Sequence, residues 1–348
     1  MKIVNARSFA RVGLLGNPSD GYYGKTLSFT FSEYCVDLRL SESSRLRFVP
    51  GEVDDAAFDS PRELVRNLRL YGYYGGVRML KAVSKLFFEY CESNGIDLPQ
   101  ANFTAEYKIN IPRLVGLSGS SAICSAMLKA LMRFYGVEIP LETCPTICLR
   151  AERDELGIAC GLQDRVVQMY NGLVFMDFNR ELLEAEGHGA YERIDVEVPN
   201  LYLSYDPNRA EESGKAHSAV RKLFNERNNN VLDVMAQLAD IAQKGRDAIV
   251  AGRLGDLPPL VDANFDLRES IFDISPENKR MIDVARSSGA SAKFAGSGGA
   301  IVGIYEDEAQ FERLSAALIS IGCRTFKPHI ASTDDEAREA VGGGWRNS

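Results

Sequence analysis

Apolar and polar residues alternate over much of the first fifty positions of the chain. Leu27, Phe29 and Phe31 occupy every second position, and the run 36–40 repeats the pattern with Val and Leu. A period of two is typical of strands with one buried face. The same period returns over 103–111. We therefore expect strands in the first fifty residues and a further strand ending near residue 111.

Helical patterns lie between and after these strands. Ser60, Pro61 and Glu63 have the order of a capping box, with Pro at the first helical position, which predicts that a helix begins there. The other predicted helices are one that ends at Asn94, one over 121–135 that stops at Gly136, two near 145–156 and 162–170, and one over 231–242. Further strands are predicted at 172–176, 292–294 and 300–304.

The order of these elements favours an α+β architecture. Strands and helices mix without the regular alternation of a doubly wound sheet. A chain of 348 residues suggests two domains, at roughly 150 residues each. The composition shifts around Pro199, which places the domains at 1–198 and 199–335. The glycine-rich remainder, 336–348, is predicted to be a flexible tail.

Composition and charge exclude several classes of protein. The chain is 45% hydrophobic and 25% charged, and 40 basic against 48 acidic residues leave a formal charge of −8. A net acidic chain without a basic block is a poor nucleic-acid binder. No run approaches the ~18 apolar residues of a membrane span, and the N-terminus lacks the apolar core of a signal peptide. We expect neither a nucleic acid nor a membrane as a partner.

The cysteines indicate a reducing compartment. Seven are scattered along the chain, none forms a Cys-x-x-Cys pair, and only three histidines are present. Buried free thiols are therefore a better interpretation than a zinc site. We expect a cytoplasmic protein.

A Gly- and Ser-rich loop between a predicted strand and a predicted helix is the main candidate for chemistry. It runs Pro112-Arg113-Leu114-Val115-Gly116-Leu117-Ser118-Gly119-Ser120-Ser121-Ala122. Backbone N–H groups in such a loop, and at the helix N-terminus behind it, suit a phosphate. The loop lacks the Gly-Lys-Ser/Thr ending of a Walker motif and the Gly-x-Gly-x-x-Gly spacing of a dinucleotide site. From its own residues it fits a phosphate loop and an ordinary helix-capping turn equally well.

Two further segments resolve this ambiguity through a resemblance. Arg11-Val12-Gly13-Leu14-Leu15-Gly16-Asn17-Pro18-Ser19-Asp20 resembles the first motif of the GHMP kinases, and the loop at 112–122 resembles their second. Lys293-Phe294-Ala295-Gly296-Ser297-Gly298-Gly299-Ala300 resembles their third. The motifs occur in the family's order and extend over nearly the whole chain. The chain is identified as similar to this family.

Within the family the chain resembles the glucuronokinases, the plant-type uronic acid kinases. Besides the first two motifs, this narrower match rests on Gly72-Tyr73-Tyr74-Gly75-Gly76-Val77-Arg78 and on Gly161-Leu162-Gln163-Asp164-Arg165-Val166, which follows Leu156-Gly157-Ile158. Ser118 is inserted before Gly119, unlike the general pattern, which favours the uronic acid branch over galactokinase or mevalonate kinase.

The resemblance implies a two-domain fold and a division of roles among residues. The N-terminal domain would be α+β, like that of ribosomal proteins, the C-terminal domain ferredoxin-like, and ATP and substrate would meet between them. Asp164 would be the general base and Arg11 the cation beside it. Ser121 and Glu152 would hold Mg²⁺, and Asp20 would accept sugar hydroxyls. The implied ATP-binding residues are Pro112, Gly116, Leu117, Ser118, Gly119, Ser120, Ser121 and Ala122.

The implied reaction is ATP-dependent phosphorylation of D-glucuronate at its anomeric hydroxyl, by a monomer or homodimer. A small sugar acid needs a partner for its carboxylate, and the candidates are Lys25, Arg165, Lys215 and Arg221. Gly296, Ser297 and Gly298 would let a turn pass close to the substrate.

Alternative functions remain open at this point. They are a kinase of another sugar (galacturonate, arabinose or a heptose), a catalytically silent sensor of sugar and ATP, and an enzyme like diphosphomevalonate decarboxylase. Retention of Asp164, Glu152 and Ser121 together argues against the sensor. The absence of a basic cluster for two phosphates argues against the decarboxylase.

Overall fold

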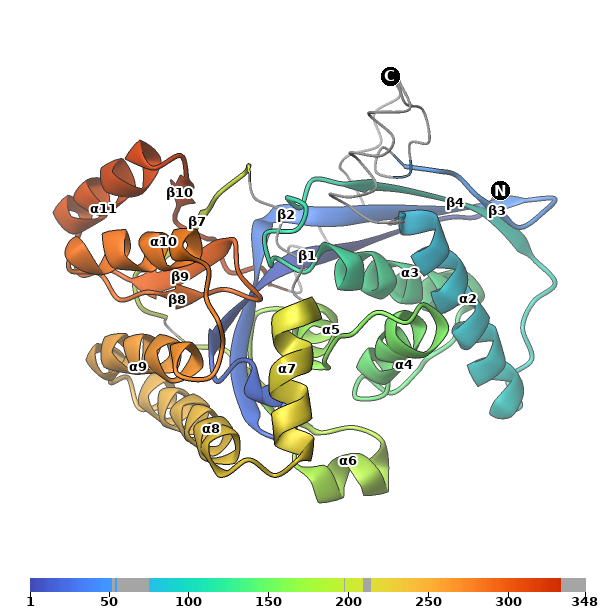
Figure 1. Ribbon diagram of the computed structural model, residues 1–348. Coiled ribbons are helices and arrows are strands. Elements are labelled where there is room, and N and C mark those ends of the chain that lie inside the picture. The colour runs from blue at the N-terminus through green and yellow to red at the C-terminus, as the bar shows by residue number, and fades with distance from the viewer. Residues whose placement is uncertain (52–53, 55–74, 197, 209–213, 333–348) are drawn as a thin grey trace, which may run out of the picture.

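Two long antiparallel strands run through the centre of the molecule (Figure 1). The computed structural model describes residues 1–51, 54, 75–196, 198–208 and 214–332, with only the backbone for 214–218. β1 spans Ile3–Leu15 and β2 spans Lys25–Ser43. Both alternating apolar runs predicted from the sequence lie in β2. The pairing shifts between them, because Phe9 pairs with Cys35 whereas Ala10 pairs with Phe31.

In the described part of the chain, β1 and β2 belong to a six-stranded sheet in the order β3-β4-β2-β5-β6, with β1 beside β2. β2 pairs antiparallel with both β4 and β5. The remaining strands of this sheet are β3 (Arg47–Phe48), β4 (Asn102–Ile109), β5 (Leu173–Asp177) and β6 (Ala190–Ile194).

Helices from the N-terminal half pack on one side of the long strands. α3 contacts β1, β2 and α2, and its buried face includes Ile123, Met127 and Leu131. It begins two residues earlier than predicted and ends at Gly136, whose positive φ of 69° suits a glycine. The helices are η1 (Ser19–Tyr22), α2 (Gly76–Ser93), α3 (Gly119–Tyr135), α4 (Cys144–Arg150), the π-helical turn η3 (Ala151–Glu155), α5 (Gln163–Tyr170) and α6 (Arg180–Glu186).

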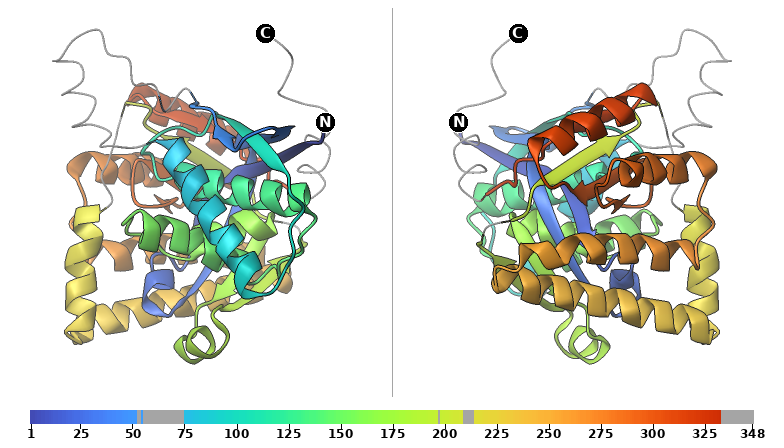
Figure 2. Two further views of the ribbon diagram at one scale, coloured as in Figure 1. Left: turned by 90° about the vertical axis from the view of Figure 1, so that its right-hand side faces the viewer. Right: turned by 90° about the vertical axis from the view of Figure 1, so that its left-hand side faces the viewer.

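The C-terminal half builds a second, four-stranded sheet among the described residues, in the order β10-β7-β9-β8. Its strands are β7 (Leu201–Tyr205), β8 (Lys293–Phe294), β9 (Ala300–Ile304) and β10 (Arg324–Phe326). Its helices are α7 (Gly214–Asn225), α8 (Asn229–Val250), η4 (Leu254–Asp256), α9 (Leu257–Glu269), α10 (Pro276–Ser287) and α11 (Glu308–Ser320). Figure 2 shows α7 standing across one end of α8.

The two halves share one core. The last strand of the large sheet ends at Ile194 and the small sheet begins at Leu201, on either side of the predicted boundary at 198. Yet α8 packs on β2, and one buried cluster joins Leu27 and Phe29 to Ala242 and Val302. Both halves therefore contribute to the walls of any site between them.

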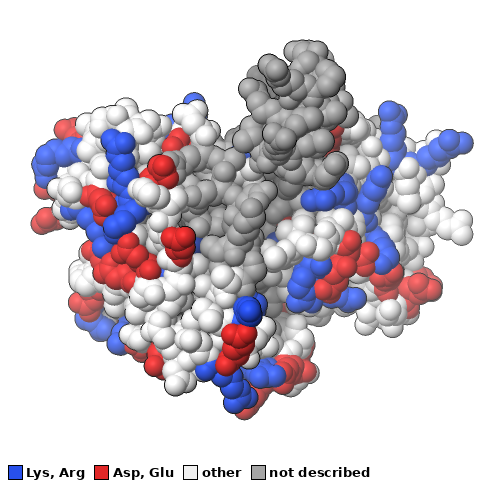
Figure 3. All heavy atoms as spheres, viewed as in Figure 1, with Lys and Arg blue, Asp and Glu red and all other residues white. Residues whose placement is uncertain are grey.

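The surface and the helices add two facts. On the face in Figure 3, the acidic and basic side chains of the described residues are interspersed. No helix in the described ranges is long and apolar enough to cross a membrane. The capping box expected from Ser60 and the tail at 336–348 lie outside the described residues.

Candidate active site

A cavity of about 540 Å³ lies where the predicted motifs meet. The first motif contributes Arg11, Asn17 and Asp20 to its wall. The rest of the wall includes Pro112, Gly116, Leu117, Ser118, Gly119 and Ser120 from the Gly/Ser loop, Gly161, Gln163, Asp164 and Arg165 around the start of α5, and Gly296 and Ser297 from the third motif. Residues nearly three hundred positions apart thus share one cavity.

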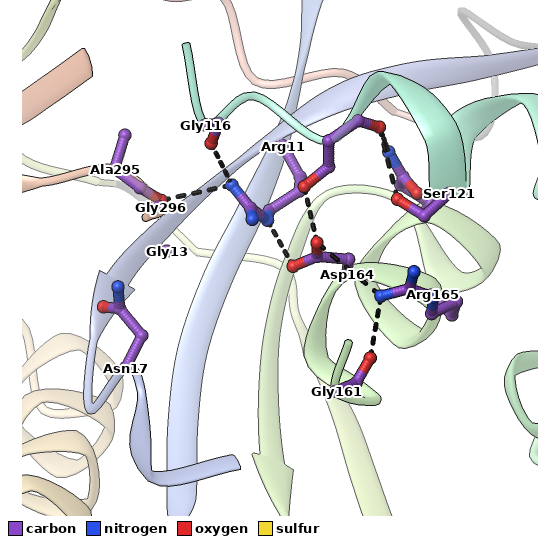
Figure 4. A network of polar contacts seen from close by, with 12 residues as sticks. Arg11, Gly13, Asn17, Gly116, Ser121, Gly161, Asp164, Arg165, Ala295 and Gly296 are labelled. Carbon is purple, nitrogen blue, oxygen red and sulfur yellow. Dashed lines mark hydrogen bonds and ion pairs between the residues drawn. The ribbon is translucent and has the colours of Figure 1, made fainter. Parts of the chain in front are cut away.

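Asp164 lies at the centre of a hydrogen-bond network in this cavity (Figure 4). Arg11 donates from Nε to Oδ1 of Asp164 over 2.5 Å, and Ser118 donates from Oγ to Oδ2 over 2.6 Å. Nη1 of Arg11 also donates to the carbonyls of Gly116, at 2.7 Å, and Ala295, at 3.2 Å. Arg11 therefore ties the carboxylate to the second and third motifs at once.

The network keeps Asp164 ionised. Burial by itself raises the pKa of this carboxyl, but the positive charges of Arg11 and Arg165 and the hydrogen bonds from Arg11 and Ser118 lower it below its usual value. The side chain still has 22% of its surface exposed. An ionised, partly accessible carboxylate fits the task of accepting a proton from a hydroxyl group.

Asp20 is a second carboxylate in the same cavity, with different surroundings. Burial and the negative charge of Asp164 raise the pKa of Asp20 to about 6, while backbone N–H groups of Gly21 and Gln163 oppose the shift. A Cβ on residue 161 would overlap Oδ2 of Asp20. Gly161 is therefore required for Asp20 to occupy its place.

Glu152 and Arg165 form a buried ion pair behind Asp164. Nη2 and Nε of Arg165 both donate to Oε2 of Glu152, and Nη1 donates to the carbonyl of Gly161 over 2.8 Å. The side chains are 0% and 3% exposed. Among the described residues, Oε1 of Glu152 is buried and has no hydrogen-bond partner. An orphaned carboxylate oxygen of this kind fits a hard cation.

The Gly/Ser loop presents the N-terminus of α3 to the cavity. Ser118 caps the helix in the left-handed region, with φ 63° and ψ 49°, and Gly119 and Ser120 follow along the cavity wall. The first N–H groups of a helix have no intrahelical partner and suit an anion. A Cβ on Gly116 would lie 2.7 Å from the carbonyl oxygen of Gly298, so the second and third motifs are in backbone contact.

Several predicted site residues lie elsewhere. Ser121 and Ala122 are buried in α3 and outside the cavity wall, as is Gly298, which faces the Gly/Ser loop. Lys25 also lies outside the wall, bonded to Gln243 at 2.9 Å and paired with Asp177 at 3.2 Å. The side chain of Lys215 lies outside the described part of the chain.

Sequence reasoning missed residues that hold the third motif in place. Arg268 of α9 donates to the carbonyls of Gly296 and Ser297. Lys293, 1% exposed, donates to the carbonyl of Gly13, Oδ1 of Asn17 and the carbonyl of Phe294. Lys293 lies within the third motif, and a lysine in an apolar strand is a usable signal in the sequence. Arg268 carried none, because it occupies an ordinary helical position.

Comparison with known proteins agrees with the fold. Residues 78–172 match the family model for the GHMP kinases N-terminal domain, and residues 246–323 match that for the GHMP kinases C-terminal domain. The chain belongs to the GHMP kinase family, and the predicted two-domain α+β fold is confirmed.

Within the family the chain is similar to two glucuronokinases of Arabidopsis thaliana. It is 47% identical to the probable glucuronokinase 2 over 304 residues, covering 85% of this chain and 82% of the relative. It is 44% identical to glucuronokinase 1 over 306 residues, covering 86% of this chain and 84% of the relative. The resemblance found in the sequence is therefore confirmed.

Solved structures share the fold at low sequence identity. A Lin0012 protein from Listeria innocua superimposes with a TM-score of 0.78 at 14% identity, over 95% of this chain and 98% of the other. Lactococcus lactis galactokinase, solved with galactose, superimposes with a TM-score of 0.70 at 14% identity, over 95% of this chain and 94% of the other.

Proposed function

We propose that the protein transfers the γ-phosphoryl group of ATP to the anomeric hydroxyl of D-glucuronate, giving D-glucuronate 1-phosphate and ADP. The observation that carries the kinase chemistry is the ionised Asp164, held by Arg11 and Ser118 in a cavity walled by the Gly/Ser loop. The choice of substrate is supported by the two glucuronokinases, which are similar over more than four fifths of the chain.

In this proposal Asp164 accepts the proton of the anomeric hydroxyl. The hydroxyl oxygen forms a bond to the γ-phosphorus, the bond from that phosphorus to the bridging oxygen breaks, and ADP leaves with that oxygen. The Gly/Ser loop and the N-terminus of α3 bind the phosphates, and Arg11 offsets negative charge beside the transferred group. Asp20 accepts hydrogen bonds from other hydroxyls of the sugar.

Mg²⁺ is the metal ion that this chemistry calls for, and in this proposal Glu152 and Ser121 would hold it. Glu152 offers its unpartnered buried Oε1, and Ser121 keeps lone pairs after donating to the carbonyl of Ser118 over 3.2 Å. The ion would neutralise charge on the phosphates.

The direct test is ADP release with a panel of free sugars: glucuronate, galacturonate, glucose, galactose, arabinose and a heptose. We expect glucuronate to give the highest kcat/KM, and phosphorus–carbon coupling in the product's NMR spectrum to place the phosphate on the anomeric carbon. A higher kcat/KM for another sugar, or phosphate at another carbon, would overturn the proposal.

Asp164→Asn tests the proposed base. We expect kcat to fall by ~10²–10⁴-fold, because an amide cannot take up the proton, while ATP binding measured by calorimetry stays close to wild type. A variant that kept more than about a tenth of wild-type kcat would show that Asp164 is not the base.

A further inference from the structure

The cavity wall contains a cation that the proposed chemistry does not use. Arg11 is paired with Asp164, Arg165 with Glu152, and Arg268 with the third motif. Arg221 of α7 also lines the cavity, and within the described part of the chain no carboxylate forms an ion pair with it.

Two neighbours, Tyr22 and Gly21, contact the guanidinium of Arg221 at the cavity wall. Its Cζ lies 4.2 Å from the centroid of the Tyr22 ring, a cation–π distance. The Tyr22 ring is itself buried and packs edge-on against Phe224 at 4.8 Å. A Cβ on residue 21 would lie 2.8 Å from Nη2, so Gly21 leaves just enough room for the guanidinium. An arginine over an aromatic ring presents its planar fork with little loss of side-chain freedom.

The location suits a negatively charged group on the sugar. Asp164 faces the reacting hydroxyl, and Asp20 lies near enough to Asp164 for its pKa to respond to that charge. Arg221 lines the same cavity, against Gly21 and Tyr22, the two residues that follow Asp20 in the chain. In a uronic acid the carboxylate is attached to carbon 5, across the ring oxygen from the anomeric carbon. Its partner must therefore line the cavity without contacting Asp164.

Lys25 and Arg165 do not meet this requirement. Lys25 is bonded to Gln243 and Asp177 outside the cavity wall. Arg165 has its donors on Glu152 and Gly161. The side chain of Lys215 lies outside the described residues. Arg113, also in the wall, is part of the Gly/Ser loop, on the side where phosphates would bind.

We infer that Arg221 binds the carboxylate of the substrate and so selects uronic acids over neutral hexoses. The inference rests on the proposed function, because it names the residue by which that site recognises its substrate. A charged group that loses its partner in a partly desolvated site is strongly penalised, so such a site rejects the neutral analogue. Glucose would leave Arg221 without a partner.

The experiment compares Arg221→Gln with Lys222→Gln, which removes the same charge one position further along α7, where the side chain is 78% exposed. Activity is measured with glucuronate, its uncharged methyl ester and glucose. For Arg221→Gln we expect kcat/KM with glucuronate to fall by about 10–100-fold, mainly through KM. Values with the ester and glucose should stay within about threefold. Lys222→Gln should match wild type throughout.

Gly21→Ala gives a second test that keeps the arginine. The added methyl group displaces the guanidinium from Tyr22, so the preference for glucuronate over glucose should shrink although the charge remains. Gly21→Ala also tests the inference if Arg221→Gln loses activity only because it misfolds. A lower melting temperature of Arg221→Gln would reveal such misfolding.

The outcomes separate the two proposals. Wild type that does not phosphorylate glucuronate overturns the proposed function and this inference together. Wild type that prefers glucuronate, with an unchanged preference in Arg221→Gln, overturns the inference alone. Loss of the preference in Arg113→Gln instead of Arg221→Gln would also overturn it, and would place the carboxylate on the Gly/Ser loop.

Discussion

Asp20 and Asp164 are two carboxylates in one cavity whose surroundings shift their pKa values in opposite directions. Asp164 has two arginines and a serine hydroxyl around it, which together outweigh burial. Burial and the charge of Asp164 raise the pKa of Asp20, and the backbone N–H groups of Gly21 and Gln163 and the charge of Arg11 lower it by less. Pairs of this kind separate the role of proton acceptor from that of a hydrogen-bonding partner.

The raised pKa of Asp20 makes a prediction about stability. A carboxyl whose pKa is higher in the folded than in the unfolded protein stabilises the fold below its unfolded pKa, and this contribution is lost as the pH rises through about 6. Above that pH the ionised Asp20 destabilises the unliganded protein. Asp20→Asn removes the charge, so we expect it to raise the melting temperature more at pH 7.5 than at pH 5.

The matched control is Asp154→Asn. Arg153 holds the pKa of Asp154 below its usual value, so its ionised form is favoured in the fold and the substitution should bring no gain at pH 7.5. Equal changes in melting temperature for Asp20→Asn at both pH values would contradict the prediction.

At the scale of the element, the start of α3 combines backbone strain with a hydrogen bond to the base. Ser118 is a non-glycine residue at φ 63°, a conformation that costs an L-residue about 1–2 kcal/mol. Its Oγ donates to Asp164 over 2.6 Å. Glycine would tolerate this backbone better, but it has no hydroxyl. The strain therefore coincides with a contact that supports the proposed base.

Comparing Ser118→Gly with Ser118→Ala separates these two effects. Both variants lose the hydrogen bond that lowers the pKa of Asp164, so the acidic limb of the kcat–pH profile should move to higher pH in both. Ser118→Gly relieves the backbone, and we expect it to be more stable than Ser118→Ala by about 0.5–1 kcal/mol in denaturant unfolding. An unchanged pH profile in both variants would exclude a role for Ser118 in setting the state of Asp164.

At the scale of the whole molecule, the site depends on backbone contact between the two halves. The carbonyl of Gly116 lies where a Cβ on Gly296 would be, and Nη1 of Arg11 bridges the carbonyls of Gly116 and Ala295. Elsewhere the halves are joined by α8 on β2 and by residues 329–331, which pair with β2 where its register with β1 shifts. The geometry at Asp164 is therefore a property of the assembled core.

Gly296→Ala should disturb this contact. The new methyl group overlaps a carbonyl oxygen that cannot move without shifting the Gly/Ser loop, so we expect a loss of about 1–3 kcal/mol of stability and a marked fall in kcat/KM. Gly255→Ala is the control, because a Cβ there has open space, and its effect should stay within about 0.5 kcal/mol. If Gly296→Ala and Gly255→Ala changed stability and kcat/KM alike, the close contact between the Gly/Ser loop and the third motif would not be required.

Local pattern was enough to predict about half of the described elements. The period of two over 27–31 and 36–40, the stop at Gly136 and the apolar stripe in α8 each depend on neighbours a few residues away, which is where the physics of strands, caps and amphipathic helices operates. Resemblance over the motifs supplied Asp164, Arg11 and Asp20, and the structure places all three in one cavity.

Contacts between distant parts of the chain decided the rest. The two alternating runs form one strand because that strand pairs with β1 along both runs. Glu152 holds Arg165 because of how η3 packs against α5. In the sequence, Lys25, Arg165 and Arg221 are equally plausible partners for the substrate carboxylate, because the sequence shows their charges but not their spatial neighbours. Only the tertiary structure gives Lys25 and Arg165 their acidic partners and leaves Arg221 on Tyr22 at the cavity wall. Asp177 and Tyr22 come from segments remote in the chain, and Glu152, thirteen residues before Arg165, meets it only because the chain between them folds back.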